Sequence, residues 1–301
     1  MEARARIAHM RVAIAGSTGM LGTSLTRHLT AVGHEVIGLV RGRPTASAQR
    51  RWDPERGRID GPGLADADAV VNLAGAPIAG ARWTRERKAE ILNSRIRATR
   101  TLVSALTPEG RCQRLLNGSA IGYYGDTGPE IVDEDSPQGA GFLAGVVAAW
   151  EAEAARSPVA TAMMRTGHVL SRQGGFLGAQ WALFAAGLGG RVGDGRQFVS
   201  WISLADHVRA MSYLLTAPIT GPVNLVAPEP VTNADFTRAF GSYLKRPTIL
   251  PMPLPAVRLL FGREFVSDAL LSGTRVRPAR LLEAGFDFRH PRIARAFAEL
   301  A

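Results

Sequence analysis

The glycine-rich stretch at residues 16–22, GSTGMLG, is the feature that most constrains the fold. It follows the short apolar run RVAIA at 11–15 and precedes a segment in which leucines recur at helical spacing as far as Gly33. The order is strand, glycine turn, helix. Glycines at this spacing permit a tight turn and a close approach of backbone N–H groups to a pyrophosphate. The helix N-terminus adds a partial positive charge that favours phosphate.

This arrangement predicts a dinucleotide site, with a purely structural glycine turn as the alternative. The residues that we expect to contact the dinucleotide here are Gly16, Ser17, Thr18, Gly19, Met20, Leu21 and Gly22.

The second expected strand, EVIGLV at residues 35–40, is followed by Arg41. An NAD site usually carries Asp or Glu at this point, about 20 residues after the glycines, to accept hydrogen bonds from the ribose 2′-hydroxyl. An arginine instead pairs with a 2′-phosphate. Arg41 therefore predicts NADP(H) as the cofactor, with a surface arginine at a strand end as the alternative. Arg43 is a second and weaker candidate.

The size and composition fit a large α/β core, because 46% of the 301 residues are hydrophobic. No apolar run approaches the roughly 18–20 residues that a membrane span needs, and no apolar signal segment follows the basic N-terminus. We therefore expect a soluble, cytoplasmic protein. The single Cys112 has no disulfide partner within the chain, and the six histidines show no metal-ligand spacing, so we expect no metal.

The net charge of +10 comes almost entirely from arginine, since Lys88 and Lys245 are the only lysines of the sequence. The arginines are scattered and form no aromatic-interleaved platform or DNA-binding motif. We expect them to be solvated or to bind small anions, with a nucleic-acid patch as the weaker alternative. From these patterns we expect a small-molecule substrate, and the many arginines favour an anionic one. We also expect a monomer or homodimer that binds neither nucleic acid nor membrane.

Four longer segments carry a family resemblance: NLAGAPIAGARWT (72–84), NSRIRATRTL (93–102), SAIGYYGD (119–126) and LLSGTRVRPARLLEAGFDFR (270–289). Together they resemble an atypical, epimerase-like group of the extended short-chain dehydrogenase/reductase superfamily, over essentially residues 10–300. The resemblance implies a Rossmann-type doubly wound parallel α/β sheet with a smaller C-terminal substrate lobe. It also implies NADP as cofactor, and a third core strand whose end contributes Leu73, Ala74 and Gly75 to the cofactor site.

The expected domains are discontinuous in sequence. Residues 10–170 and 201–228 are predicted to form the NADP-binding Rossmann domain. Residues 171–200 and 229–301 are predicted to form the substrate-binding lobe, in part because 171–200 is rich in glycine and arginine. Residues 1–9 are predicted to be a disordered or non-native extension.

Typical members of the superfamily use a Tyr-x-x-x-Lys pair on a helix, in which the phenol is the acid/base and the lysine holds the cofactor ribose. The motif does not occur in this sequence, because the residues four positions after its four tyrosines are Thr127, Gly128, Ala217 and Pro247. Where the family places the pair, the helical segment GFLAGVVAAWEAEA (141–154) carries Phe142 or Leu143 for the tyrosine and Val146 or Val147 for the lysine.

Ser119 matches the serine upstream of that pair, because it stands four residues before Tyr123 as in the common S-x-x-x-Y-G motif. Tyr124 then occupies the usual glycine position. We expect Ser119 near the nicotinamide and the hydroxyl of Tyr124, or else of Tyr123, at the substrate; a strand-end serine and simple aromatic packing are the alternatives. Arg165, at the end of the next strand, is expected to reach the site and supply a positive charge.

These residues lead to two functional hypotheses. The first is an NADP(H)-binding, epimerase-like oxidoreductase that acts on a small-molecule carbonyl or alcohol with a non-standard acid/base group. The second, favoured by the absent Tyr-x-x-x-Lys pair, is a non-catalytic NADP(H)-binding sensor or partner-binding protein.

Overall fold

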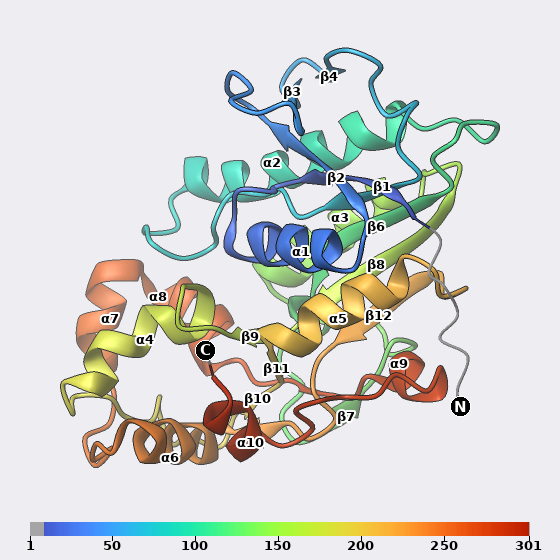
Figure 1. Ribbon diagram of the computed structural model, residues 1–301. Helices are drawn as coiled ribbons and strands as arrows, with labels where there is room; N and C mark the ends of the chain where they lie inside the picture. The colour runs from blue at the N-terminus through green and yellow to red at the C-terminus, as the bar shows by residue number, and fades with distance from the viewer. Residues whose placement is uncertain (1–8, 301) are drawn as a thin grey trace, which may run out of the picture.

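The computed structural model describes residues 9–300. Of the extension predicted for residues 1–9, residues 1–8 therefore lie outside the described residues. An eight-stranded sheet forms the centre of the molecule, in the order β12-β8-β6-β5-β1-β2-β3-β4 (Figure 1). Its strands are β1 (Arg11–Ala15), β2 (Glu35–Val40), β3 (Gln49–Asp53), β4 (Arg58–Ile59), β5 (Ala69–Asn72), β6 (Arg114–Ala120), β8 (Ala160–Thr166) and β12 (Gly221–Leu225). All neighbours are parallel except β3 and β4 at one edge. The predicted Rossmann-type α/β sheet is confirmed.

Helices cover both faces of this sheet (Figure 1). On one face lie α1 (Met20–Ala31) and α5 (Leu204–Leu214); on the other lie α2 (Arg85–Ser104) and α3 (Phe142–Ala154). Strand β1 shows the alternation that this requires, because Val12 and Ile14 pack into the core with α1 and α5, whereas Ala13 and Ala15 pack with α2. The strand is buried on both faces, which explains why RVAIA is almost wholly apolar.

The strand order reverses at β1, which lies between β2 and β5. From β1 the chain runs outward through β2, β3 and β4 on one side, and through β5, β6, β8 and β12 on the other. In open α/β sheets, ligands bind in the crevice outside the carboxyl ends of the strands at such a reversal.

The rest of the chain forms a second body beside the sheet (Figure 1). Helices α4 (Gly175–Ala185), α6 (Asn233–Leu244) and α10 (Ile293–Ala298) enclose a cluster of aromatic side chains that includes Phe184, Phe236, Phe240 and Phe297. Three small strand pairs join it to the sheet domain: β9 (His168–Leu170) with β11 (Trp201–Ser203), β10 (Phe198–Val199) with β13 (Val231–Thr232), and β7 (Ile131–Val132) with β14 (Arg275–Val276). The remaining elements are η1 (Ile121–Tyr124), α7 (Leu254–Phe261), α8 (Arg263–Phe265), the π-helical η2 (Val266–Leu271) and α9 (Ala279–Glu283).

One part of the C-terminal segment lies elsewhere than the sequence suggested. The segment around α9 was assigned to the substrate lobe, but Leu281, Phe286 and Phe288 pack in the same core cluster as Val208 and Met211 of α5. The chain therefore returns to the sheet domain before it ends in the second body. No helix among residues 9–300 is long and apolar enough to cross a membrane.

Candidate functional site

A cavity of about 680 Å³ opens at the crevice where the strand order reverses. This volume lies in the range of cofactor and small-molecule sites, roughly 300–1,000 Å³. The glycine turn lines one end, residues that follow β5, β6 and β8 line the middle, and residues 267–274 line the other end.

The backbone of the glycine turn is possible only with glycine at two positions. Gly16 has a φ of +79°, and a Cβ there would lie 2.8 Å from the carbonyl group of Leu73. A Cβ on Gly22 would collide with the carbonyl oxygen of Gly16, so the first turn of α1 can pack this closely on the end of β1 only without a side chain. Of the seven residues predicted here, those that line the cavity are Gly16, Gly19, Met20, Leu21 and Gly22.

Of the other residues predicted for the cofactor site near the glycine turn and β5, Leu73 lies in the cavity wall and the rest lie beside it. A Cβ on Gly38 of β2 would lie 2.9 Å from the Oγ atom of Ser17, so this side chain packs over the second strand. Thr18 is exposed. Of the three residues predicted after β5, Leu73 lines the cavity, whereas Ala74 and Gly75 do not.

Arg41 lines a second, shallower hollow beside the carboxyl end of β2. The walls of this hollow are Arg41, Gly42, Arg43, Pro44, Gln49, Arg50, Arg51, Asp60 and Gly61. Arg50 is paired with Asp66, with 2.8 Å between Nη2 and Oδ2. In the described part of the chain, no carboxylate lies within 4.0 Å of a side-chain nitrogen of Arg41, Arg43 or Arg51. The hollow therefore offers three uncompensated guanidinium groups to an anion.

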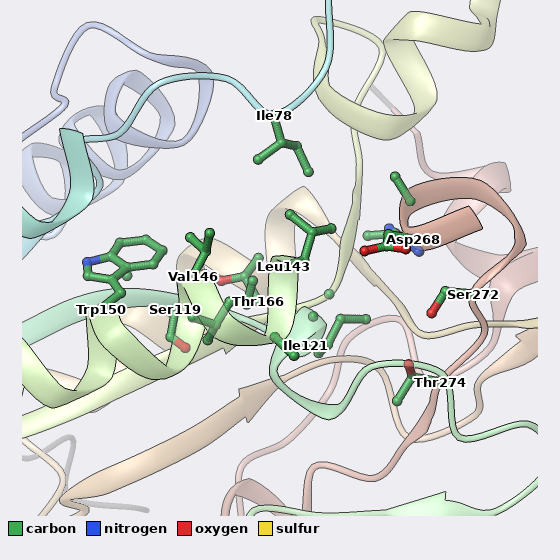
Figure 2. A pocket seen from close by; sticks show the side chains of 18 of the residues that line it. Ile78, Ser119, Ile121, Leu143, Val146, Trp150, Thr166, Asp268, Ser272 and Thr274 are labelled. Carbon is green, nitrogen blue, oxygen red and sulfur yellow. The ribbon is translucent and has the colours of Figure 1, made fainter. Parts of the chain in front are cut away.

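Helix α3 forms an apolar wall of the cavity. Figure 2 shows Leu143, Val146 and Trp150 in a row along this helix, with Asp268 and Ser272 facing them from the C-terminal segment. The residues of α3 that line the cavity are Leu143, Ala144, Val146, Val147 and Trp150. No titratable side chain of α3 lines the cavity.

Ser119 lines the cavity, but its hydroxyl is turned to a buried carboxylate. Its Oγ atom donates a hydrogen bond of 2.5 Å to Oε1 of Glu151. Glu151 also forms a bidentate ion pair with Arg165, with 2.8 Å from Nε to Oε1 and 2.8 Å from Nη2 to Oε2. Only 4% of the Arg165 side chain is exposed, and its guanidinium lies 3.6 Å from the ring centroid of Tyr123. Its charge is neutralised below the cavity, so its predicted contact with the cofactor stays a prediction.

Tyr124 is part of the same buried network. Its hydroxyl donates to Oδ1 of Asn224 at 2.7 Å and accepts from Nη1 of Arg165 at 3.0 Å. Burial raises the pKa of Tyr124 to about 12. Neither Tyr123 nor Tyr124 belongs to the cavity lining. Proton donation by either tyrosine stays a prediction, and a structural role accounts for both hydrogen bonds of the Tyr124 hydroxyl.

The sequence permits a second match to the S-x-x-x-Y-G motif, and the cavity lining does not distinguish the two, because it contains both Ser119 and Ala120. Tyr124 is followed directly by Gly125, and the residue four positions before Tyr124 is Ala120, which lines the cavity. In this second match Ala120, which has no polar side chain, stands at the position of the upstream serine, and Ser119 is the residue before it.

Several polar residues of the cavity were missed in the sequence. Those from the C-terminal segment are Ser267, Asp268, Ser272 and Thr274, and those from the sheet domain are Arg95, Asp126, Thr166 and His168. Asp268 accepts a hydrogen bond of 3.1 Å from the backbone N–H of Phe142 and so caps α3, whose N-cap residue is Gly141. No local signal could have revealed a contact between residues 126 positions apart. Arg95, in contrast, lies within the recognised NSRIRATRTL segment.

His168 is the histidine of the cavity wall. Its ring stacks on Phe176 with 4.3 Å between centroids, and burial lowers the pKa of His168 to about 4. The imidazole is therefore neutral near pH 7 and can both donate and accept a hydrogen bond. Within the described residues, no group of three or more His, Cys, Asp or Glu side chains is placed to hold a metal ion.

Comparisons with known proteins cover nearly the whole chain. Residues 12–226 match the family described as NAD dependent epimerase/dehydratase family, and residues 252–300 match a domain of unknown function, DUF1731. Epimerase family protein Mb2239 of Mycobacterium bovis is 46% identical over 294 residues, which cover 96% of this chain and 97% of that protein. Human epimerase family protein SDR39U1 is 36% identical over 301 residues, which cover 97% of this chain and 99% of that protein.

Two solved structures extend this similarity to three dimensions. The crystal structure of human SDR39U1 (isoform 2) with NADPH matches with a TM-score of 0.89 and 35% identity, covering 97% of this chain and 99% of that one. The crystal structure of a nucleoside-diphosphate sugar epimerase from Corynebacterium glutamicum matches with a TM-score of 0.78 and 35% identity. That match covers 97% of this chain and 58% of the other.

Proposed function

This chain belongs to the NAD dependent epimerase/dehydratase family, and we propose that it binds NADP(H) and transfers a hydride between the nicotinamide and a small carbonyl or alcohol. The observation that carries the proposal is the single cavity that runs from the glycine turn to residues 267–274. Such a cavity accommodates the phosphates at the helix N-terminus and leaves its far end for a second molecule.

The preference for NADP(H) over NAD(H) is supported by the second hollow. Its uncompensated arginines, Arg41 first among them, suit the 2′-phosphate that only NADP(H) carries. The similar human protein SDR39U1 was crystallised with NADPH, which agrees with this choice.

The bound cofactor would supply the hydride, and the side chains of the cavity would orient the substrate and handle the proton. Because Ser119 donates its own proton to Glu151, its oxygen presents lone pairs and can accept a hydrogen bond from a substrate hydroxyl. His168 is neutral and lines the cavity, so we propose that it hydrogen-bonds the substrate oxygen and accepts the proton of a substrate hydroxyl when an alcohol is oxidised. We further propose a small anionic substrate and a cytoplasmic monomer or homodimer, on the sequence patterns alone.

A non-catalytic NADP(H) sensor is the second candidate, and one specific observation favours it. The α3 wall is apolar where the superfamily carries its acid/base pair, with Leu143, Val146 and Val147 in the lining. The C-terminal segment contacts α3 through Asp268, which caps its N-terminus, and contacts α2 through an ion pair of 2.6 Å between Lys88 and Glu264. Occupancy of the cavity could thereby alter the position of a surface segment that a partner recognises.

Calorimetric titration with NADPH and NADH tests the cofactor. We expect tighter binding of NADPH, a loss of this preference in Arg41→Ala, and no loss in the control Arg27→Ala, which changes an exposed arginine of α1. A preference for NADH, or a preference for NADPH that survives Arg41→Ala, contradicts the proposal.

Turnover is tested separately, by following NADPH oxidation with carbonyl compounds and NADP⁺ reduction with alcohols. Turnover that falls in His168→Asn while NADPH affinity is kept supports the enzyme. Tight NADPH binding without turnover of any compound supports the sensor.

A further inference from the structure

Helix α7 is apolar around almost its whole circumference, yet one side of it faces solvent. Its sequence, LPAVRLLF, contains Arg258 as the only polar side chain. The side chains that pack inward against the protein are Leu254, Val257 and Phe261. On the other side, Leu259 is 78% exposed and Leu260 is 67% exposed. A helix that is apolar all round is normally buried, so the outer side of α7 is suited to being covered by another surface.

The exposed apolar surface continues from α7 onto the loop before it and the end of α4. Residues 245–253 form this loop, in which the backbone N–H of Met252 donates to the carbonyl oxygen of Arg191, beyond the end of α4, at 2.8 Å. Figure 1 shows α4 and α7 at the same edge of the second body. The exposed apolar side chains of the loop and of the end of α4 are Ile249, Leu250, Leu183 and Leu188. Together with Leu259 and Leu260 they form a surface that we call the apolar edge.

Every charge on the stretch 245–263 is positive. The stretch contains no Asp or Glu, and its four cations are Lys245, Arg246, Arg258 and Arg263. In the described part of the chain none of the four has an ion-pair partner, unlike nearby Lys88, which pairs with Glu264 at 2.6 Å. The net charge of +10 adds a general attraction to anionic surfaces. A second copy of the chain would bring like charges together here, so an anionic partner fits this surface better.

The side chains of the apolar edge project into solvent, with an exposed fraction as high as 86% for Ile249. Peptide helices are bound in concave grooves, whereas projecting apolar side chains beside cations suit insertion into a membrane interface. We propose that the apolar edge binds an anionic lipid membrane surface. Its apolar side chains enter the boundary between headgroups and acyl chains, and its cations meet the lipid phosphates.

This mode of binding differs from the one that the sequence was searched for. We expected no membrane contact because no apolar run is long enough to span a bilayer, but an element that lies in the interface needs no such run. None of residues 245–263 lines the cavity, so membrane binding by the apolar edge does not depend on bound NADP(H).

Flotation of the full chain with lipid vesicles tests the proposal. The two probes are vesicles of phosphatidylcholine alone and vesicles in which about one-third of the lipid is phosphatidylglycerol. We expect the anionic vesicles to be bound roughly 10- to 100-fold more tightly than the neutral ones, because each cation near an anionic surface adds to the attraction. Binding should weaken as the salt concentration rises from about 0.05 M to about 0.5 M, because salt screens these charges.

Two double variants separate the apolar and the charged contributions. L259E/L260E should bind the anionic vesicles roughly 10- to 100-fold more weakly, because it removes two apolar anchors and adds two repelled charges. R258Q/R263Q should bind roughly tenfold more weakly and with less dependence on salt. The matched control is V32E/I131E, which adds the same two charges at side chains that are 46% and 60% exposed outside the apolar edge. It should bind within about threefold of the unaltered protein, since its charges lie away from the lipid.

The proposal is overturned if the unaltered protein does not float with the anionic vesicles, or if L259E/L260E binds them as tightly as V32E/I131E does. Circular dichroism of each variant shows whether it keeps the fold. Light scattering without vesicles adds a further outcome. A dimer that L259E/L260E converts to a monomer would show that a second copy of the chain covers the apolar edge, and this result also overturns the proposal.

Discussion

Replacing Tyr124 by Phe removes one hydroxyl from a buried polar network, and we expect the loss to fall on stability rather than on ligand binding. The hydroxyl donates to Asn224 at 2.7 Å and accepts from Arg165 at 3.0 Å. Phenylalanine fills the same space, so the edge-on contact with Tyr123, at 5.5 Å between ring centroids, is kept. The perturbation is therefore confined to two hydrogen bonds.

The size of the effect follows from what each partner retains. Nη1 of Arg165 keeps a contact of 3.3 Å with the carbonyl oxygen of Glu134, and the guanidinium keeps both bonds to Glu151. The lost bond to Arg165 should therefore add little to the loss of stability. Oδ1 of Asn224 has no second hydrogen bond among the described residues. An unsatisfied buried polar atom costs about 1–3 kcal/mol, so we expect a loss of roughly 2–3 kcal/mol in the free energy of unfolding. No charge is lost near pH 7, because the pKa of Tyr124 is about 12.

Urea unfolding followed by circular dichroism measures this loss, as a lower midpoint at unchanged slope. Tyr213→Phe is the control, because its hydroxyl donates to the carbonyl oxygen of Ala284 at an exposed site, where the loss should be below about 1 kcal/mol. The affinity of Tyr124→Phe for NADPH should stay within about twofold. Unchanged stability together with a tenfold loss of NADPH affinity or of turnover would show that this hydroxyl serves the cavity, as the sequence suggested.

Three further outcomes follow from the same structure. Gly22→Ala should abolish NADPH binding in a calorimetric titration, because its Cβ collides with the carbonyl oxygen of Gly16; a dissociation constant within threefold of the unaltered protein contradicts the geometry of the turn. Glu151→Gln should lower the free energy of unfolding by about 3–5 kcal/mol in urea, because it leaves the charge of Arg165 buried and uncompensated; a loss below about 1 kcal/mol argues against the ion pair. Burial lowers the pKa of His207 from 6.5 to about 4, so only the unfolded state gains this proton as the pH falls from 6.5, and stability should drop by about 2 kcal/mol at pH 5. His207→Gln should lack that part of the drop when urea midpoints at pH 7.5 and 5 are compared, and an equal drop in both proteins refutes the linkage.

The local parts of the fold could be predicted because their signals lie within a few residues. The strand at 35–40 has the predicted bounds, and Ser203 caps α5 locally by accepting a hydrogen bond of 3.1 Å from the backbone N–H of Asp206. The far end of the cavity could not be predicted in this way. Asp268 caps α3 from η2, and the glycine at the N-cap of that helix gives no indication of where its capping group comes from.

The serine and the tyrosines were assigned to the chemistry because the sequence shows hydroxyls but not the direction in which they point. Pairing across the sheet decides the direction: Ser119 of β6 and Asn224 of β12 both lie opposite Arg165 of β8. The three side chains form one row, and Glu151 of α3 packs on it. A buried arginine in that row needs a carboxylate and further acceptors, and Glu151 and the Tyr124 hydroxyl supply them.

Ser119, Tyr124 and Arg165 therefore help to hold the ends of three strands together, and their predicted roles toward a ligand stay predictions. Because the face of α3 toward the cavity is apolar, the charged side chains of the lining, Arg95, Asp126 and Asp268, and the proposed acid/base group His168 all come from other parts of the chain. Under the proposed function, turnover requires His168 whereas cofactor binding does not, so a change of this residue separates the two candidate functions. Tight NADPH binding by the unaltered protein without turnover of any compound identifies a sensor, whereas turnover that stops in His168→Asn while NADPH binding is kept identifies an enzyme whose acid/base group lies outside the helix of the missing pair.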